Sequence, residues 1–202
     1  METKVSRRER DQERHRREIL AAAKSVFVNR GFEGATMQEI AADAEFSLAT
    51  VYKYFESKEQ LFQALLAENM RRYLLELDGA MVDVKSPLER IKTSIRTSIR
   101  ILANDKDLSH LLLGDMRGLW FPGGVTQAAN VAYRALFAYY QSLFQEAQAV
   151  RELCDVDPSE AALCLVGTLH LRLVYSLFIE PRKPLDAEMI LRVVLGPIAA
   201  AS

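Results

Sequence analysis

The chain has 202 residues, half of them hydrophobic and 26% of them charged, so it is long enough to bury a substantial core. Its formal net charge of −1 excludes a protein coated in positive charge, but this average hides an asymmetry. Residues 1–30 carry nine Lys or Arg against five Asp or Glu. A basic end on a nearly neutral body is typical of a nucleic-acid-binding head joined to a body of another kind.

The N-terminus has no apolar segment of the signal-peptide type, and Cys154 and Cys164 are expected to remain reduced thiols in the core. We therefore expect a cytoplasmic protein. The most apolar run, 161–179, is long enough to raise the question of a membrane span. Arg172 and His170 near its centre favour a buried helix of a soluble protein instead.

The first helix is predicted to cover about residues 13–29, with Gly31 as its left-handed terminator. Residues 1–13 are charged and lack apolar periodicity, so we expect them to be disordered or frayed. The arginines in and beside this segment allow two interpretations. They form either a solvated, ion-paired helix face or an arm that contacts DNA, and the helices that follow slightly favour the arm.

Residues 36–58 read as two short helices joined by a tight turn, followed by the start of a third helix. Thr36 and Glu39 form a T-x-x-E capping box, which predicts that the first of these helices begins at Met37. Glu45 and Phe46 leave room only for a sharp corner.

Ser47 is a suitable N-cap for the second helix, Leu48 to Tyr54. This helix has little to bury beyond Val51. Its other residues are small, hydroxylated, aromatic or basic, which suits the edge of a DNA major groove. A second capping signal at 57–60 opens a long helix that should continue to about Met81.

This stretch resembles the TetR-type bacterial repressors over roughly residues 14–66. The resemblance is carried by Gly31-Phe32, Thr36-Met37, Ile40-Ala41, Ala44, Phe46-Ser47, Thr50-Val51-Tyr52, Tyr54-Phe55, Ser57-Lys58-Glu59 and Leu61. The chain departs from the family pattern at Glu45 and Ala49, where glycine is usual or frequent. A positive φ at Glu45 would cost about 1 kcal/mol, and Ala49 changes the surface offered to the bases.

The helix-turn-helix interpretation predicts that Tyr54 and Lys58 bind DNA phosphates. It also predicts that the second short helix, the recognition helix, faces the DNA major groove. The alternative is a helical hairpin in an ordinary bundle. The predicted DNA-binding residues are Thr36, Met37, Gln38, Ser47, Leu48, Ala49, Thr50, Tyr52, Lys53, Tyr54 and Lys58.

Beyond the head, helices are predicted at about 86–100, 108–113, 126–150, 158–179 and 185–195. In the first of these helices, Ile91, Ile95 and Ile99 form an apolar row. The basic row beside it is expected to be a solvated face. The last two helices are apolar over most of their circumference, with Gly167 inside the first of them. Apolarity on two sides requires two partners, and the resemblance implies that these helices pair with a second chain.

The glycine-flanked Trp120-Phe121 loop indicates a cavity with a mobile mouth, or else a packed corner. We expect a hydrophobic or amphipathic effector, with any acidic group near Arg117 or Arg172. For each residue singly, plain core packing is the competing interpretation, and for His170 we expect a satisfied core histidine. The candidate ligand-binding residues are Leu112, Met116, Arg117, Trp120, Phe121, Tyr133, Phe137, Tyr140, His170, Arg172 and Tyr175.

No phosphate-binding loop, H-E-x-x-H, C-x-x-C or nucleophile elbow occurs in the sequence, and the three histidines lie far apart. We therefore expect no cofactor, no metal and no enzyme activity. A small helical enzyme would need a catalytic constellation that the sequence lacks.

The sequence thus predicts an all-α protein with a three-helix head, residues 1–58, and a body of five or six helices, residues 59–202. The resemblance implies a homodimeric repressor that a small ligand releases from a palindromic DNA operator. A shift of the helix at 61–81 would change the spacing of the two recognition helices. A DNA-binding dimer with no ligand remains an alternative.

Overall fold

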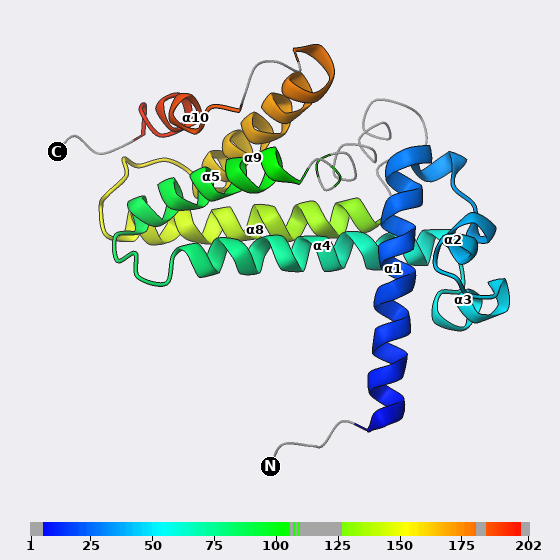
Figure 1. Ribbon diagram of the computed structural model, residues 1–202. Coiled ribbons are helices and arrows are strands. Elements are labelled where there is room, and N and C mark those ends of the chain that lie inside the picture. The colour runs from blue at the N-terminus through cyan, green and yellow to red at the C-terminus, as the bar shows by residue number, and fades with distance from the viewer. Residues whose placement is uncertain (1–5, 106, 108, 110–126, 181–184, 199–202) are drawn as a thin grey trace. The chain divides into compact units, whose positions relative to one another are not determined.

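The computed structural model describes residues 6–105, 107, 109, 127–180 and 185–198. These residues are mainly helical and include no β-strand, which agrees with the predicted all-α class. The elements are α1 (Arg7–Gly34), α2 (Met37–Asp43), α3 (Leu48–Tyr54), α4 (Lys58–Ala80), α5 (Pro87–Asn104), α8 (Gln127–Ala149), α9 (Pro158–Val174), the π-helix η1 (Tyr175–Ile179) and α10 (Ala187–Val194) (Figure 1).

The chain divides into two compact units. The first contains α1, α2, α3 and the start of α4 as far as Glu68. The second contains the rest of α4, α5, nearly all of α8, and α9, η1 and α10. One continuous helix, α4, therefore belongs to both units.

Helix α1 begins at Arg7, so the prediction of a disordered or frayed segment is wrong for residues 7–13. Ser6 caps the helix: its hydroxyl accepts a hydrogen bond from the Glu9 amide, and its own amide donates to the Glu9 carboxylate at 2.7 Å. This reciprocal capping box satisfies backbone amides that a helix start otherwise leaves without partners. The backbone hydrogen bond from Ser6 also lowers the pKa of Glu9.

The end of α1 is shaped by Gly31, which has φ 70° and ψ 171° and interrupts the helical conformation. Glycine adopts this positive φ without the steric penalty of a side chain. The positive φ predicted for Gly31 is present, but its ψ differs from that of the predicted αL terminator, and a further helical segment extends to Gly34 rather than ending near Asn29.

The core of the first unit joins all of its helices. Ile19 and Ala23 of α1, Ile40 of α2, Val51 of α3 and Leu61 of α4 are fully buried. Apolar side chains at helical spacing drive this packing. Aromatic rings add to it, since the ring centroids of Phe27 and Phe62 lie 4.9 Å apart in an edge-to-face arrangement.

In the second unit, α4, α5 and α8 run alongside one another (Figure 1). The predicted isoleucine row is confirmed, because Ile91, Ile95 and Ile99 are all buried in the core. The core also holds buried hydroxyl groups, and the Ser98 hydroxyl lies 2.8 Å from that of Tyr140.

The basic row on α5 is ion-paired on the surface. Lys92 contacts Glu89 at 2.6 Å, Arg96 contacts Glu188 at 2.8 Å, and Arg100 contacts Glu76 at 3.0 Å. Exposed pairs of this kind contribute little stability. Because all three cations are paired with carboxylates on the surface, the row agrees with the predicted solvated face.

Helix α9 is covered on one side only. Leu165, Leu169 and Leu173 are buried, whereas Leu163 is 56% exposed and Leu171 is 67% exposed. Gly167 lies on the uncovered side, where an added Cβ would meet nothing within 4 Å apart from its two chain neighbours and the backbone of its own helix. The stretch Pro158–Leu177 is long and apolar enough to span a membrane, and only 28% of its most apolar window is buried. Within the single chain, therefore, one side of this helix is buried and the other is exposed.

Cys154 and Cys164 are both exposed, so the expectation of small core residues is wrong for both. Cys164 lies on the uncovered side of α9, close to Gly167. Cys154 follows α8, and its backbone amide donates to the carbonyl of Ile198 at 2.8 Å.

Candidate nucleic-acid interface

The corner between α2 and α3 is built by local hydrogen bonds. Thr36 and Glu39 form the predicted capping box at the start of α2. The amide of Phe46 donates to the carbonyl of Ala41 at 3.0 Å and closes the turn. Glu45 occupies the one strongly constrained position of the turn, with φ 57°. The predicted positive φ at this non-glycine residue is therefore confirmed.

Helix α3 is held at its start by Ser47, whose hydroxyl accepts from the Thr50 amide at 3.1 Å and lies 2.8 Å from the Thr50 hydroxyl. Val51 is the only residue of α3 that is buried. Tyr52 is 45% exposed, and Ala49 and Lys53 are also exposed. The short helix thus presents most of its surface outward, with groups that can donate to or accept from bases and phosphates.

Two residues at the start of α2 have less to offer DNA than the sequence suggested. The side chain of Met37 is 6% exposed and packs in the core, which differs from its predicted role at the interface. The Thr36 hydroxyl is engaged with the Glu39 carboxylate at 2.9 Å. Gln38, the next residue of α2, is exposed.

Lys58 has a structural role that the sequence did not reveal. Its ammonium donates to the carbonyl oxygens of Ala35 at 3.1 Å and Glu33 at 3.4 Å. The same nitrogen lies 4.6 Å from the centroid of the Phe32 ring. Carbonyl groups at the end of a helix carry partial negative charge, so Lys58 fastens the start of α4 to the end of α1.

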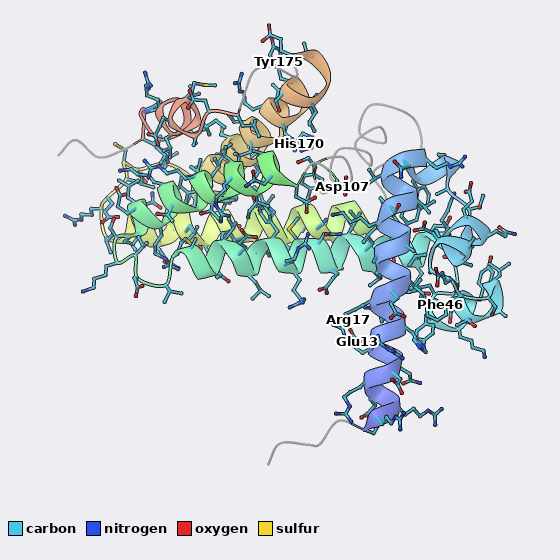
Figure 2. The ribbon with its side chains drawn as sticks, viewed as in Figure 1. Glu13, Arg17, Phe46, Asp107, His170 and Tyr175 are labelled. Carbon is cyan, nitrogen blue, oxygen red and sulfur yellow. The ribbon has the colours of Figure 1, made fainter. Side chains whose placement is uncertain are left out.

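The N-terminal half of α1 packs against the recognition helix, and sequence analysis missed these contacts. Nδ1 of His15 lies 3.2 Å from the Tyr54 hydroxyl, and its ring lies edge-on to Phe46 at 5.0 Å. The guanidinium of Arg16 lies 5.5 Å from the centroid of the Phe55 ring. Figure 2 shows Phe46 on the α3 side of α1, with Glu13 and Arg17 on the other side.

A surface groove of about 650 Å³ lies between α1 and the corner after α2. Three carboxylates line it, those of Glu18, Asp43 and Glu45, beside Arg14 and His15. Carboxylates repel DNA phosphates. The surface suited to DNA therefore ends at this groove.

The second unit contains part of the predicted ligand site. The Tyr133 hydroxyl lies 2.9 Å from Nδ1 of His170, so these two predicted residues meet. Nε2 of His170 is buried and has no hydrogen-bond partner among the described residues, and burial lowers the pKa of this imidazole. The expectation of a satisfied core histidine is therefore wrong for one of its two nitrogens.

Arg172 and Tyr175 form a separate contact, in which the guanidinium carbon lies 5.8 Å from the Tyr175 ring centroid. Nε of Arg172 is buried and likewise has no hydrogen-bond partner in the described part of the chain. Figure 2 marks His170 on α9 and Tyr175 at the start of η1. Residues two apart on a helix point in different directions, so His170 and Arg172 do not converge.

Two more predicted ligand residues lie on α8. Tyr140 is fully buried and its hydroxyl meets Ser98, which makes it a core residue, while Phe137 is half-buried. Leu112, Met116, Arg117, Trp120 and Phe121 lie outside the described residues. Within the described part of the chain, no group of His, Cys, Asp or Glu is arranged to hold a metal ion.

Two short helices at a tight corner, the second of them outward-facing, constitute a helix-turn-helix. Residues 19–65 match the model of the bacterial regulatory proteins of the tetR family. Over these residues the chain is similar to this family. The uncharacterized HTH-type transcriptional regulator YfiR of Bacillus subtilis (strain 168) is 37% identical over 109 residues, which cover 51% of this chain and 52% of YfiR. The chain thus spans about half the length of the curated relatives it matches.

Solved structures share the fold over nearly the whole chain. FadR from Bacillus subtilis in complex with stearoyl-CoA has a TM-score of 0.77 at 19% identity, covering 88% of this chain and 96% of FadR. AibR in complex with isovaleryl coenzyme A and operator DNA has a TM-score of 0.67 at 23% identity, covering 91% of this chain and 97% of AibR. At these identities the likeness shows the fold alone.

Proposed function

We propose that this protein is a sequence-specific DNA-binding transcriptional regulator that represses by occupying a palindromic operator as a homodimer. The observation that carries the proposal is α3, a capped helix that fully buries only Val51 and leaves Ala49, Tyr52 and Lys53 exposed. A helix with so little to bury is a poor core element, but its residues suit the major groove. The resemblance to DNA-binding regulators extends through the residues that build this corner.

In this proposal, Thr50 and Tyr52 with Lys53 face the base edges, while Tyr54 donates to a phosphate. Ser47, Leu48 and Ala49, together with Gln38 at the start of α2, complete the surface. Lys58 adds positive charge near the phosphates, although its ammonium already holds the end of α1.

Selection of operators from random DNA, followed by footprinting, tests the DNA-binding proposal. We expect one palindromic site, because two heads related by a two-fold axis read inverted half-sites. In a repeat of the selection, Thr50→Ala should alter the preferred bases in both half-sites without abolishing phosphate-dependent binding. Recovery of no preferred sequence by the unmodified protein would overturn the proposal.

The homodimer is assigned to the uncovered side of α9 and the adjoining α10. Leu163 and Leu171 are exposed there, each one helical turn from Gly167, and Val193 of α10 is 59% exposed. A contiguous apolar face on a helix marks a protein interface. Gly167 leaves open space in the single chain, which would allow a partner helix to approach closely.

We assign the second unit a small hydrophobic or amphipathic effector, with acyl-coenzyme A compounds as the class to test first. FadR and AibR are similar to this chain in fold and have stearoyl-CoA and isovaleryl coenzyme A in their complexes. In this chain, Tyr133 and the buried Nε2 of His170 supply a polar pair among apolar groups. Ligand sites typically combine an apolar lining with a few such polar groups.

Effector binding would act through α4, which extends from the first unit into the second. A shift of α4 changes the spacing of the two recognition helices, and the operator fixes that spacing. Acyl-CoA compounds of graded chain length should release the protein from its operator, as followed by fluorescence anisotropy of labelled DNA. No release by any of them, together with no thermal stabilisation, would leave a regulator without this effector class.

A further inference from the structure

Among the contacts of the DNA-binding head, the one between His15 and Tyr54 joins residues from two different helices. His15 lies on α1, and Tyr54 is the last residue of α3, 39 positions later. Nδ1 of the imidazole lies 3.2 Å from the tyrosine hydroxyl, in a part-buried position. The two rings are nearly perpendicular, with centroids 6.3 Å apart.

A second aromatic side chain, Phe46, also packs against the imidazole. The Phe46 ring lies edge-on to it, with centroids 5.0 Å apart and an interplanar angle of 63°. Phe46 precedes α3 and Tyr54 ends it, so His15 contacts both ends of the recognition helix. A ring held at two points keeps its orientation, which a hydrogen bond of defined direction requires.

The direction of this hydrogen bond follows from what each group can donate. A tyrosine hydroxyl has one proton, and a DNA phosphate can only accept. Tyr54 can therefore donate to a phosphate and bond His15 at the same time only if Nδ1 carries a proton and donates to the hydroxyl oxygen. The Arg14 guanidinium, which can only donate, lies 3.5 Å from Nε2. In a hydrogen bond between these two groups Nε2 is the acceptor, and the tautomer that fits both contacts has its ring proton on Nδ1.

We propose that His15 is a positioning residue for DNA binding, which donates to the Tyr54 hydroxyl and so directs the single proton of that hydroxyl to a DNA phosphate. The proposal rests on the DNA-binding function proposed above. A hydroxyl that accepts one hydrogen bond becomes a stronger donor in the next, because hydrogen bonds in a chain polarise one another. Without His15, the hydroxyl would be free to rotate away from the phosphate.

This role differs from that of a cation on the DNA. In this arrangement only the uncharged Tyr54 hydroxyl meets the phosphate, and His15 contacts that hydroxyl rather than the phosphate. Loss of the contact should therefore lower affinity without changing the number of counterions that binding releases. A net hydrogen bond corresponds to a change of about threefold to tenfold in affinity.

A double-mutant cycle on the selected operator tests the proposal. His15→Phe keeps the ring against Phe46 but removes the donor, and Tyr54→Phe removes the hydroxyl. Each single change should weaken binding by about threefold to tenfold. His15→Phe should have less than about a twofold effect when Tyr54 is already Phe, since the two groups act as one unit. His15→Asn, which places an amide donor near the position of Nδ1, should restore most of the lost affinity.

Tyr52 provides the matched control, because it is an exposed tyrosine on the same helix. The effects of Tyr52→Phe and His15→Phe should be additive. The melting temperature of every variant shows whether a loss of operator affinity comes from a lost contact or from an unfolded DNA-binding head.

Three results would overturn the proposal while leaving DNA binding intact. These are unchanged operator affinity in His15→Phe, additive effects of His15→Phe and Tyr54→Phe, and a fall of about one unit in the salt slope of His15→Phe. The last result would make His15 itself a phosphate-binding cation. If the unmodified protein selects no operator, the proposed function fails first, and this inference falls with it.

Discussion

Helices α3 and α9 both leave much of their surface uncovered, but they uncover different chemistry. In α3 only Val51 is buried, and the outward groups are hydroxyl, aromatic and basic. In α9 one complete side is buried, and the other presents Leu163 and Leu171 around Gly167. The composition of an uncovered helix face therefore indicates the kind of partner that covers it. Polar and basic groups on a short helix suit DNA, whereas an apolar stripe suits another protein chain.

The largest expected effect tests the apolar side of this comparison. Leu171→Glu should raise the dissociation constant of the dimer by more than about 100-fold, because each copy would bring an uncompensated carboxylate to the interface. Sedimentation velocity over a dilution series measures this constant. Val82→Glu is the control, since Val82 is 79% exposed in the connection after α4 and should leave association unchanged. Equal association of Leu171→Glu and the unmodified protein would place the interface elsewhere.

Gly167→Leu should also weaken the dimer, by about 1–3 kcal/mol, because a large side chain overpacks a close helix contact. In the single chain the new Cβ meets nothing within 4 Å apart from its two chain neighbours and the backbone of its own helix, and leucine is the better helix former by about 0.8–1 kcal/mol. The isolated chain should therefore be no less stable. Urea unfolding at low and high protein concentration separates the two effects. A variant that dimerises normally would show that Gly167 is remote from the partner.

The polar side of the comparison is tested by Lys58→Ala. Operator affinity should fall for all sequences alike, and the salt slope should fall by about 0.9. The structure adds a loss of about 1 kcal/mol in the free energy of unfolding, because Lys58 holds two carbonyl groups at the end of α1. Lys53→Ala, at an exposed position of α3, should spare the free energy of unfolding. Lower stability with an unaltered salt slope would limit Lys58 to its structural role.

The corner that presents α3 can be relieved of strain. Glu45→Gly should raise the free energy of unfolding by up to about 1 kcal/mol, because φ 57° strains a residue that has a Cβ. Arg151 has φ 60° after α8 in the other unit and provides the matched change, Arg151→Gly. Urea unfolding measures both variants. A loss of stability in Glu45→Gly would mean that the glutamate side chain contributes more than its backbone costs.

The smallest expected effect concerns His170, whose pKa is lowered by burial. An unfolded histidine takes up its proton at a pH of about 6.5, so between the two pKa values the unfolded state binds more protons. Stability contributed by neutral His170 is therefore present above about pH 6.5 and is lost as pH falls below it. Melting temperatures at pH 7.5 and 5.5 should show a smaller acid loss in His170→Gln than in the unmodified protein. An identical loss in both would exclude this histidine as the source.

The bounds of α2 and α3 could be predicted because their signals are local. Thr36, Glu39 and Ser47 cap helices within three residues of themselves. The same rule could have found the start of α1, since Ser6 and Glu9 form an identical S-x-x-E box. The acidic and basic residues around it lack apolar periodicity, and that absence suggested disorder.

The contacts of Lys58 and His15 could not be predicted in the same way. Lys58 meets carbonyl groups 23 and 25 positions earlier, and His15 meets a hydroxyl 39 positions later. Such pairs exist only after helices pack, and periodicity contains no information about them. Similarly, apolarity on both sides of α9 predicted a need for two partners, but it could not indicate which side the chain itself covers.

The two thiols give the molecule a built-in chemical reporter. Cys164 lies on the apolar side of α9, and Cys154 lies in the connection after α8. An alkylating reagent should modify both in the isolated chain. Association through α9 should protect Cys164 from the reagent and leave Cys154 accessible to it. The ratio of the two labelling rates then reads out assembly directly. Because both thiols are native to the sequence, the assembly state can be followed in crude extracts without any engineered label.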